Sequence, residues 1–331
     1  MQPAVSVIVP IYNVEPFFER CLRSLFGQTL EDMEYIFVND CTPDGSMSLL
    51  ETVLNDYPHR REQVRVINHE HNMGLGTTRR DGMKAAKGDY VISCDSDDWV
   101  DTDAYGKMYA KAIEEDADLV CCGYYEEYAN KRVARLPSPH ISLPIPLFRV
   151  FASTNGIGGF LWNKLVRRKL YVEEEVYPYE GINMWEDVGV TVRLCYLSAK
   201  TVMLTEPFYH YNQQNVNAYT AVLRNRPEAL VNEPILCVRQ LEAFFHAHNV
   251  DDEHERQFCY VKFNAKHSLL LAGRFQEWLK LFPETHQYIW DYPATKFYRR
   301  VCYTLASKGI FIHYKLRNGV VRCLPSLVSR K

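Results

Sequence analysis

The sequence predicts an α/β protein in which a mostly parallel, doubly wound sheet precedes a helical C-terminal region. Residues 4–9 form a continuous apolar run rich in β-branched side chains, which is typical of a strand buried on both faces. Strand-like and helix-like segments then alternate through the first hundred residues, and this alternation favours parallel strands joined by right-handed crossover helices. From residue 226 onward the pattern changes to helices alone.

Each expected element has a local signal. The helix expected at 16–27 carries apolar residues at helical spacing and ends at Gly27. The other elements expected in the first hundred residues are strands at 34–38, 64–67 and 89–93, and helices at 46–54 and from a glycine-rich turn to about residue 86. Beyond them we expect strands at 118–128 and 201–214 and helices at 226–248 and 253–272. Four prolines at 137–146 indicate a connector, and glycines at 156–159 indicate a turn.

Composition excludes several protein classes. The chain has 331 residues, 47% of them hydrophobic, which is enough for a substantial core and excludes a disordered protein. The ten cysteines form no CxxC pair and no zinc-type cluster, so we expect buried free thiols. We expect no signal peptide and no spanning helix, because a basic leader segment is missing and no run of about 18 apolar residues occurs.

The charge is distributed unevenly along the chain. Residues 1–292 hold 29 basic and 41 acidic side chains, a formal charge of −12, whereas 293–331 hold nine basic and no acidic ones. Aromatic and aliphatic residues lie between those cations, which favours contact of 293–331 with an anionic membrane surface. The alternative is a tail that pairs with the acidic body. Nucleic acid is not an expected partner, because no base-reading module is present.

Polar residues follow each of the first four expected strands, at the edge where a doubly wound sheet binds its ligands. They form the segments 10–13, 39–45, 72–79 and 95–98. Three carboxylates within the last of these segments repel one another unless a cation lies among them, and all-oxygen ligands favour Mg²⁺ or Mn²⁺. The alternative is a solvated acidic turn that caps the next helix.

Four ordered motifs resemble those of the inverting family 2 glycosyltransferases, which have the GT-A fold, and in particular the bacterial polysaccharide type. The motifs are SVIVPIYN at 6–13, VNDCTPDGS at 38–46, NMGLGTTRRDGMKAAKGDY at 72–90 and DSDDW at 95–99. The resemblance implies that Pro10 and Tyr12 line a nucleobase pocket and that Asp40 hydrogen-bonds the base.

The resemblance also implies a diphosphate and metal site. Its expected donor-binding residues are Asp95, Ser96 and Asp97, its expected metal ligands are Asp97 and Asp98, and its expected cofactor is Mn²⁺ or Mg²⁺. Arg79 is expected near the nucleotide. Because Thr78-Arg79-Arg80 replaces the family's usual Ala-Arg-Asn, the roles of Arg79 and Arg80 are interchangeable at this point.

The second half of the sequence carries the expected acceptor site and catalytic base. The resemblance implies three residues near the acceptor pocket: Trp162, Asn163 and Lys164. A buried Trp162 that anchors a strand is the alternative. Glu186 and Asp187 match the family's Glu-Asp motif, which implies that Asp187 is the catalytic base with Glu186 as its substitute; otherwise both cap the next helix. His210 is expected to be a structural histidine rather than a metal or phosphate contact.

These features predict a metal-dependent inverting transferase that moves a sugar from a nucleotide-diphosphate sugar, expected to be a UDP-sugar, to a saccharide or lipid-linked saccharide hydroxyl in cell-surface polysaccharide synthesis. The expected domains are a GT-A domain at 1–222, with a donor half at 1–123 and an acceptor half at 124–222, and a helical region at 223–331. The expected location is the cytoplasm or the inner face of the cytoplasmic membrane. The alternatives are a sugar nucleotidyltransferase and a catalytically inactive glycan-binding module.

Overall fold

The computed structural model describes residues 2–137, 158–215, 227–292 and 295–323. The chain divides into two compact units, residues 1–218 and residues 219–331. Most of the proline-rich connector expected at 137–146, and the first half of the glycine turn at 156–159, lie outside the described residues.

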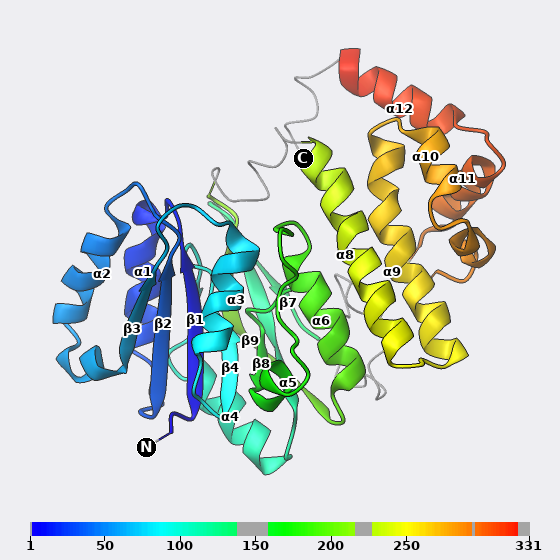
Figure 1. The fold of residues 1–331 in the computed structure, drawn as a ribbon. Coiled ribbons are helices and arrows are strands. Elements are labelled where there is room, and N and C mark those ends of the chain that lie inside the picture. The colour runs from blue at the N-terminus through cyan, green and yellow to red at the C-terminus, as the bar shows by residue number, and fades with distance from the viewer. Residues whose placement is uncertain (1, 138–157, 216–226, 293–294, 324–331) are drawn as a thin grey trace. The chain divides into compact units, whose positions relative to one another are not determined.

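The first unit is built on one mixed sheet with the strand order β3-β2-β1-β4-β8-β6-β9-β5, and with β7 paired to β6 (Figure 1). Four parallel strands make up its first half: β1 (Val5–Ile11), β2 (Met33–Asn39), β3 (Val64–Asn68) and β4 (Tyr90–Ser93). The second half holds β5 (Trp99–Val100), β6 (Leu119–Glu127), β7 (Arg132–Arg135), β8 (Lys164–Arg167) and β9 (Thr201–Asn212). The predicted α/β fold class is confirmed.

The antiparallel strands are the part of the sheet that periodicity did not indicate. β8 runs antiparallel to both β4 and β6, and β5 runs antiparallel to β9, whereas β6 and β9 are parallel. β5 has two residues and β8 has four, which is too short for an alternation of apolar and polar residues to be recognised.

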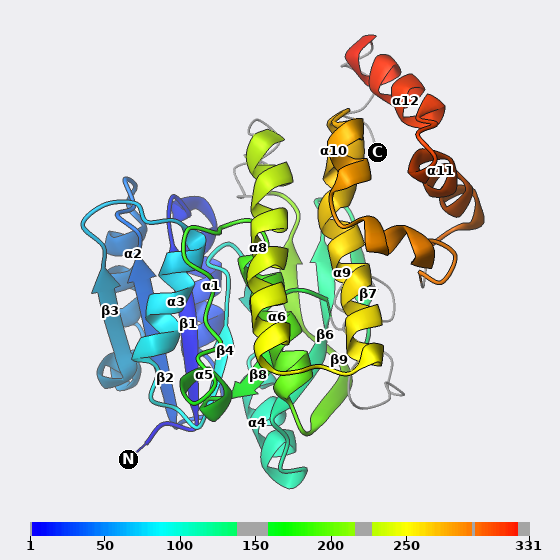
Figure 2. The ribbon, with the colours of Figure 1, turned by 45° about the vertical axis from the view of Figure 1, so that its right-hand side comes forward.

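Helices cover both faces of the parallel strands. They are α1 (Glu15–Phe26), α2 (Ser46–Asn55), α3 (Leu75–Ala85) and α4 (Ala104–Glu114), followed later in the unit by α5 (Lys169–Val172) and α6 (Glu186–Leu197); a 3-10 turn spans Pro58–Gln63. Figure 2 shows α3 in front of β1 and β2 and α1 behind them. The apolar stripe of α1, including Phe18 and Leu22, packs with the odd-numbered residues of β1, such as Val7, in the main core.

Because side chains alternate along a strand, the even-numbered residues of β1 point to the other face. Ile8 there meets α3 at Gly82, where a Cβ would lie 2.4 Å from Ile8 Cγ2 and 3.1 Å from Val38 Cγ2. The missing side chain therefore allows α3 to lie directly on β1 and β2. This close approach sets the depth at which the N-terminal turn of α3 meets the carboxyl edge of the sheet.

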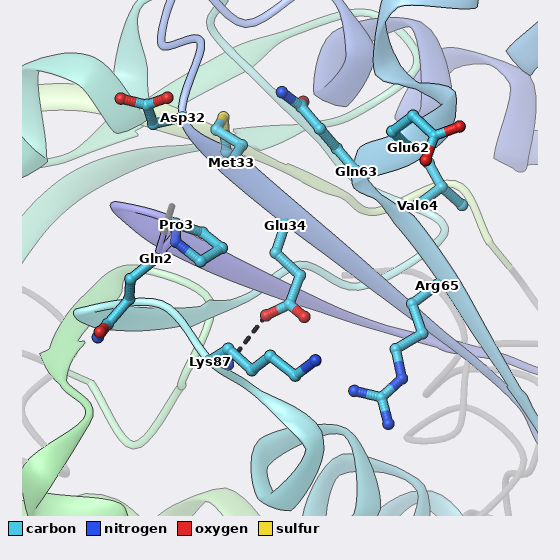
Figure 3. Close-up of a pocket in the computed structure, with 10 residues that line it drawn as sticks. All are labelled: Gln2, Pro3, Asp32, Met33, Glu34, Glu62, Gln63, Val64, Arg65 and Lys87. Atoms are coloured by element: carbon cyan, nitrogen blue, oxygen red, sulfur yellow. Dashed lines mark hydrogen bonds between the residues drawn. The ribbon is translucent and has the colours of Figure 1, made fainter.

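A pocket of about 400 Å³ lies at the opposite, amino edge of β1, β2 and β3 (Figure 3). Glu34 lies within it, and its Oε2 accepts hydrogen bonds from Ser6 Oγ (2.6 Å) and the Lys87 backbone N (2.9 Å). Lys87 and Arg65 add positive charge to the same lining. This buried carboxylate ties β2 to the turn before β4, far along the strands from the edge that carries the motifs.

The second unit is helical, as predicted. Its elements are α8 (Pro227–Ala247), α9 (Asp252–Leu271), α10 (Phe275–Lys280), α11 (Phe297–Ser307), α12 (Ile312–Cys323) and a 3-10 turn at Pro283–Tyr288. The Asp251 side chain caps α9 by accepting a hydrogen bond from the His254 backbone N (2.9 Å). No helix in the described part of the chain is both long and apolar enough to cross a membrane.

A buried lysine organises the centre of this unit. Lys266 Nζ donates to the carbonyl oxygens of Leu281 (2.8 Å) and Phe282 (2.9 Å) and lies 2.9 Å from His286 Nε2. Burial lowers the pKa of Lys266 to about 7. The ammonium group thus satisfies carbonyls at the end of α10 and holds the following turn against α9.

We expect Gly82→Ala to destabilise the protein by about 1–3 kcal/mol, because its methyl group overlaps Ile8. Gly106→Ala in α4 is the matched control, since its new Cβ would have its nearest neighbour at 3.6 Å. That control should stabilise the protein by about 0.4–1 kcal/mol, because alanine has fewer backbone conformations than glycine in the unfolded chain. Urea unfolding measures both changes, and a Gly82→Ala variant as stable as wild type would contradict the close packing of α3.

Candidate active site

Five separate segments of the chain meet at the carboxyl edge of the parallel strands. Ile11 lies opposite Asn39, and Ile8 lies opposite Ser93, so the residues that follow β1, β2 and β4 share one edge. The N-terminal turn of α3 and that of α6 approach the same edge, because a buried ion pair joins Arg79 to Glu186. The structure thus brings together most of the residues that the motifs singled out.

The acidic turn at 95–98 is held by the end of β9. Tyr209 Oη accepts a hydrogen bond from the Asp95 backbone N (3.0 Å) and donates one to Asp98 Oδ2 (2.7 Å). The Asn212 backbone N donates to Asp98 Oδ1 (2.7 Å), and its side-chain Nδ2 donates to the Asp97 carbonyl (3.1 Å). The conformation of the turn is therefore fixed from outside the motif.

The three carboxylates of this turn have different surroundings. Asp98 is buried and both of its oxygens accept hydrogen bonds from protein groups, whereas Asp97 accepts one from Asn215 Nδ2 (2.8 Å) on Oδ2. Burial, together with the nearby Asp97 and Asp95, raises the pKa of Asp98 well above its usual value. Burial and Asp95 raise the pKa of Asp97 as well. Ser96 between them is also buried.

This arrangement fits a divalent cation held jointly with a phosphate ligand. Among the described residues, no group of three or more His, Cys, Asp or Glu side chains is arranged to hold a metal by itself. Mg²⁺ and Mn²⁺ commonly bind through one or two carboxylates plus substrate phosphates. Burial and the nearby Asp95 raise the pKa of Asp97, and a cation beside it would oppose both effects.

Arg79 links the acidic turn to the start of α6. Its Nη2 lies 2.6 Å from Asp95 Oδ1 and its Nε lies 3.1 Å from Glu186 Oε1, and the guanidinium is almost fully buried. Burial acts to lower the pKa of Arg79, but the attraction of Asp95 and Glu186 outweighs it, and the pKa is raised. Arg79 Nη1 has no hydrogen-bond partner within the part of the chain that the structure describes.

Two glycines allow the 182–186 segment to lie against α3. Gly74 has a φ of +87°, and a Cβ there would lie 2.5 Å from Asn183 Oδ1. A Cβ on Gly76 would lie 2.2 Å from the Ile182 carbonyl oxygen. The Gly76 backbone N donates to Asn183 Oδ1 (3.0 Å) and secures the contact.

The turn that leads into α6 is strained, and it sets the two acidic residues apart. Trp185, directly before Glu186, has a φ of +73°, which is unfavourable for a residue with a bulky side chain. Glu186 is buried against Arg79, whereas Asp187 keeps partial exposure and makes no ion pair within the described residues. Burial and Asp187 raise the pKa of Glu186 well above its usual value, and burial raises the pKa of Asp187.

Asp40 is more enclosed than its predicted role requires. Its Oδ1 accepts hydrogen bonds from His69 Nδ1 (2.8 Å) and the Met73 backbone N (2.7 Å), and its Oδ2 accepts one from the Gly74 backbone N (2.9 Å). Asp40 therefore orders the segment that leads into α3. At the end of β1, Pro10 is buried, whereas Tyr12 is 48% exposed and open to a ligand.

The predicted acceptor residues lie beneath the site rather than on its surface. Trp162 stacks on Tyr209 with ring centroids 4.3 Å apart, and Asn163 Nδ2 donates to the Cys122 carbonyl (3.2 Å). Lys164 is fully buried, and its Nζ donates to the Phe160 carbonyl (2.5 Å). This burial favours the strand-anchoring alternative for Trp162.

His210 lies on the opposite face of β9 from Tyr209 and is surrounded by protein groups. Its ring stacks between Trp99 and Tyr125, with centroid distances of 5.1 and 5.2 Å. Its ring nitrogens lie 2.7 Å from Glu127 Oε1 and 3.1 Å from Asp101 Oδ1. These contacts favour the structural role expected for this histidine.

Sequence reasoning missed the residues that hold the site in place. These are His69, Asn183, Tyr209, Asn212 and Asn215, which bind the motif residues through hydrogen bonds. Tyr209 and Asn212 lie at the end of an expected strand, and that position was the only signal available for them. His69 and Asn183 follow no recognisable pattern.

Comparison with known proteins is consistent with this geometry. The family model described as "Glycosyl transferase family 2" matches residues 6–173. The uncharacterized glycosyltransferase EpsJ of Bacillus subtilis is 34% identical over 227 residues, which are 67% of this chain and 64% of EpsJ. The match therefore spans less than two thirds of that relative's length.

Solved structures show the same fold. Staphylococcus aureus TarS 1–349 in complex with UDP-GlcNAc aligns with a TM-score of 0.59 at 18% identity, over 97% of this chain and 92% of that one. The mannosyltransferase PcManGT of Pyrobaculum calidifontis, in complex with GDP-Man and Mn²⁺, aligns with a TM-score of 0.53 at 14% identity, over 100% of this chain and 89% of that one.

We expect Tyr209→Phe to lower the free energy of unfolding by about 1.5–3 kcal/mol, because the buried Asp98 carboxylate loses a donor. Tyr171→Phe is the matched control, since Tyr171 is also buried and its hydroxyl makes no hydrogen bond within the described residues. Its cost should stay below about 1 kcal/mol. Equal losses in urea unfolding would show that the Tyr209 hydroxyl does not hold the acidic turn.

Proposed function

The chain belongs to glycosyl transferase family 2, and we propose that it transfers a sugar from a UDP-sugar to a hydroxyl of a saccharide or lipid-linked saccharide, with inversion at the anomeric carbon. One observation carries the proposal: Arg79 joins the acidic turn on one side to the Glu186–Asp187 pair on the other. A donor bound at the turn would thus have its reacting carbon beside a carboxylate. Family membership favours sugar transfer over nucleotidyl transfer, and free nucleoside diphosphate rather than pyrophosphate is the expected product.

The proposed donor site follows the carboxyl edge of the sheet. Tyr12 is exposed there and is assigned to the nucleobase together with Pro10 and Asp40, and Asp40 also orders the adjoining segment. The TarS structure with UDP-GlcNAc supports a uridine nucleotide by analogy of fold. Arg79 Nη1, a buried donor without a protein partner among the described residues, is assigned to the donor diphosphate.

The proposed cofactor is Mn²⁺ or Mg²⁺, held by Asp97 together with the donor diphosphate. Asp95 and Ser96 complete the donor contacts of the turn. We assign Asp98 to positioning rather than to direct coordination, because Tyr209 and Asn212 already occupy both of its oxygens. A bound cation would offset the negative charge that builds up on the leaving diphosphate. The Mn²⁺ in the PcManGT complex supports this assignment by analogy of fold.

Asp187 is proposed as the base. The acceptor hydroxyl attacks the anomeric carbon while Asp187 takes its proton, and the bond between that carbon and the diphosphate oxygen breaks with its electron pair leaving on the diphosphate. A single displacement of this kind inverts the configuration. Glu186 is less suited to this role, because Arg79 holds it in a buried ion pair.

The proposal extends to the organisation of the chain. Residues 1–123 form the donor half and 124–222 the acceptor half of the transferase domain, and the helical region that follows serves the acceptor or the membrane. Cell-surface polysaccharide synthesis at the inner face of the cytoplasmic membrane is the proposed setting. Release of UDP from a panel of nucleotide sugars in the presence of Mn²⁺ tests the proposed donor directly.

We expect Asp187→Asn to reduce kcat by about 10²–10⁴-fold, the usual contribution of a positioned base, while donor affinity stays unchanged. Glu186→Gln, which leaves the base in place but frees Arg79, should weaken donor binding more than Asp187→Asn does. UDP release with acceptor present and UDP titration measure the two effects. A collapse of kcat confined to Glu186→Gln would exchange the two roles.

The acid limb of the wild-type pH profile should lie above the ordinary pKa of an aspartate, about 3.9. The base acts in its ionised form, and burial raises the pKa of Asp187, so turnover falls as pH drops through that raised value. Asp187→Asn should lose this limb. If the acid limb of the pH profile persists unchanged in Asp187→Asn, the titrating group is not Asp187.

Removal of divalent metal by EDTA should abolish transfer, and added Mn²⁺ should restore it. Asp97→Asn should lose the metal-dependent part of UDP binding, because the cation loses a direct ligand. The matched control is Asp103→Asn, which removes the same charge from an exposed pair with Lys107 a few residues away. If Asp97→Asn binds UDP with the same metal dependence as wild type, Asp97 is not a metal ligand.

A further inference from the structure

The inner faces of α11 and α12 are fixed by aromatic packing within the second unit. Tyr303 meets Phe263 edge to face with centroids 4.8 Å apart, and it stacks on Tyr314 at 6.4 Å. Phe311 stacks on Phe275 at 4.6 Å. Tyr303, Phe311 and Tyr314 are all buried. The two helices therefore keep a defined side toward α9 and α10.

The opposite sides of both helices are apolar and exposed. On α11, Phe297, Val301 and Leu305 follow one another at intervals of four and share the face away from Tyr303. Phe297 is 72% exposed. On α12, Ile312 and Leu316 have the same spacing, and each is 65% exposed.

Trp290 extends this apolar surface, with its ring 5.8 Å from that of Phe297. Trp290 is itself 46% exposed. The outward residues form what we call the α11–α12 face: Trp290, Phe297, Leu305, Ile312 and Leu316. An exposed apolar stretch of this kind marks a surface that binds something.

The cations around this face have no acidic partners. Lys308 and Lys315 are exposed beside it, and neither makes an ion pair within the described residues. Arg299 and Arg317 lie on the sides of Tyr303 and Tyr314 instead, and burial together with these two cations lowers the pKa of His267. The 293–331 sequence supplies no acidic residue that would neutralise them. The sequence leaves open a basic tail that pairs with acidic residues. The described residues of the second unit do not favour that alternative.

Arg300 shows how a basic residue of this region is used when its role is structural. Its guanidinium donates to the carbonyl oxygens of Trp290 (2.5 Å), Tyr292 (3.0 Å) and Thr295 (3.0 Å). It thus secures the turn before α11. Among the described residues, the side chains of Lys308 and Lys315 have no such acceptors.

We propose that the α11–α12 face docks on an anionic lipid bilayer. Apolar side chains directed away from the unit, flanked by unpaired cations of one sign, match an interface in which apolar groups enter the acyl boundary and cations meet anionic headgroups. α11 and α12 have 11 and 12 residues, so they lie along such a surface and do not cross it. The purpose of the contact rests on the proposed function: it brings the enzyme to a lipid-linked acceptor.

Flotation of the full-length protein with vesicles tests the proposal. We expect binding to phosphatidylcholine vesicles that contain about one third phosphatidylglycerol, weak binding to phosphatidylcholine alone, and loss of binding in high salt. Equal binding to both vesicle types, or none to either, would overturn the proposal.

Two pairs of variants locate the contact. Lys308→Glu with Lys315→Glu should lower the vesicle partition coefficient by about 25-fold or more, at about fivefold for each lost cation. The matched control is Arg239→Glu with Lys280→Glu, two exposed cations elsewhere in the unit, with an expected change below about threefold. Equal losses in both pairs would attribute binding to net charge alone and contradict the α11–α12 face.

The apolar part is tested by Ile312→Ser with Leu316→Ser, for which we expect about a tenfold loss or more. Its control is Leu236→Ser with Leu271→Ser, exposed leucines of α8 and α9. If the first pair instead dissolves a dimer detected by sedimentation and leaves flotation intact, the face binds a second copy and the lipid proposal fails.

The docking proposal and the proposed function have separate readouts. UDP release in solution from a nucleotide sugar should be the same in wild type and in all four variants, because none of these residues belongs to the candidate active site. Absence of UDP release in wild type with normal flotation would contradict only the proposed function. Normal UDP release without flotation would contradict only the docking.

Discussion

The candidate site depends on one buried guanidinium placed between two carboxylates. Desolvating an arginine costs several kcal/mol unless opposite charges lie close to it, and Arg79 obtains them from Asp95 after β4 and Glu186 at the start of α6. The guanidinium in turn lies 2.6 Å from Asp95 Oδ1 and 3.1 Å from Glu186 Oε1. The ion pairs therefore fix the distance between the acidic turn and the Glu186–Asp187 pair, on which the proposed displacement relies.

Around that interaction, the fold holds each reactive segment with groups from elsewhere in the chain. Tyr209 and Asn212 at the end of β9 donate hydrogen bonds to Asp98 in the acidic turn. Asp40 accepts a hydrogen bond from the Gly74 backbone N, directly before α3. Gly74 and Gly76 let Ile182 and Asn183 approach α3 closely, and Trp185 in the same segment has a left-handed backbone conformation. Strain of this kind persists only where surrounding contacts outweigh it, and it occurs here two residues before the proposed base.

The second unit uses its charged residues in two ways. Lys266 and Arg300 turn inward and donate hydrogen bonds to carbonyl oxygens at the turns between the helices. Lys308 and Lys315 stay on the surface beside apolar side chains. This separation of inward and outward cations is what makes the outer face distinctive, and net charge alone does not reveal it.

The sequence by itself determined the strand and helix alternation, the four motifs and the Glu-Asp pair, because these depend on local periodicity and on residues adjacent in the chain. Only the tertiary structure decided which member of each motif is open to a ligand. Asp97 and Asp98 are neighbours with the same chemistry, yet Asp98 is enclosed by β9; Trp162 and Lys164 sit in a motif, yet lie in the core. The antiparallel strands β5 and β8 are also too short to be predicted from an alternation of apolar and polar residues. Burial and hydrogen-bond partners arise from segments distant in sequence, and no local pattern encodes them.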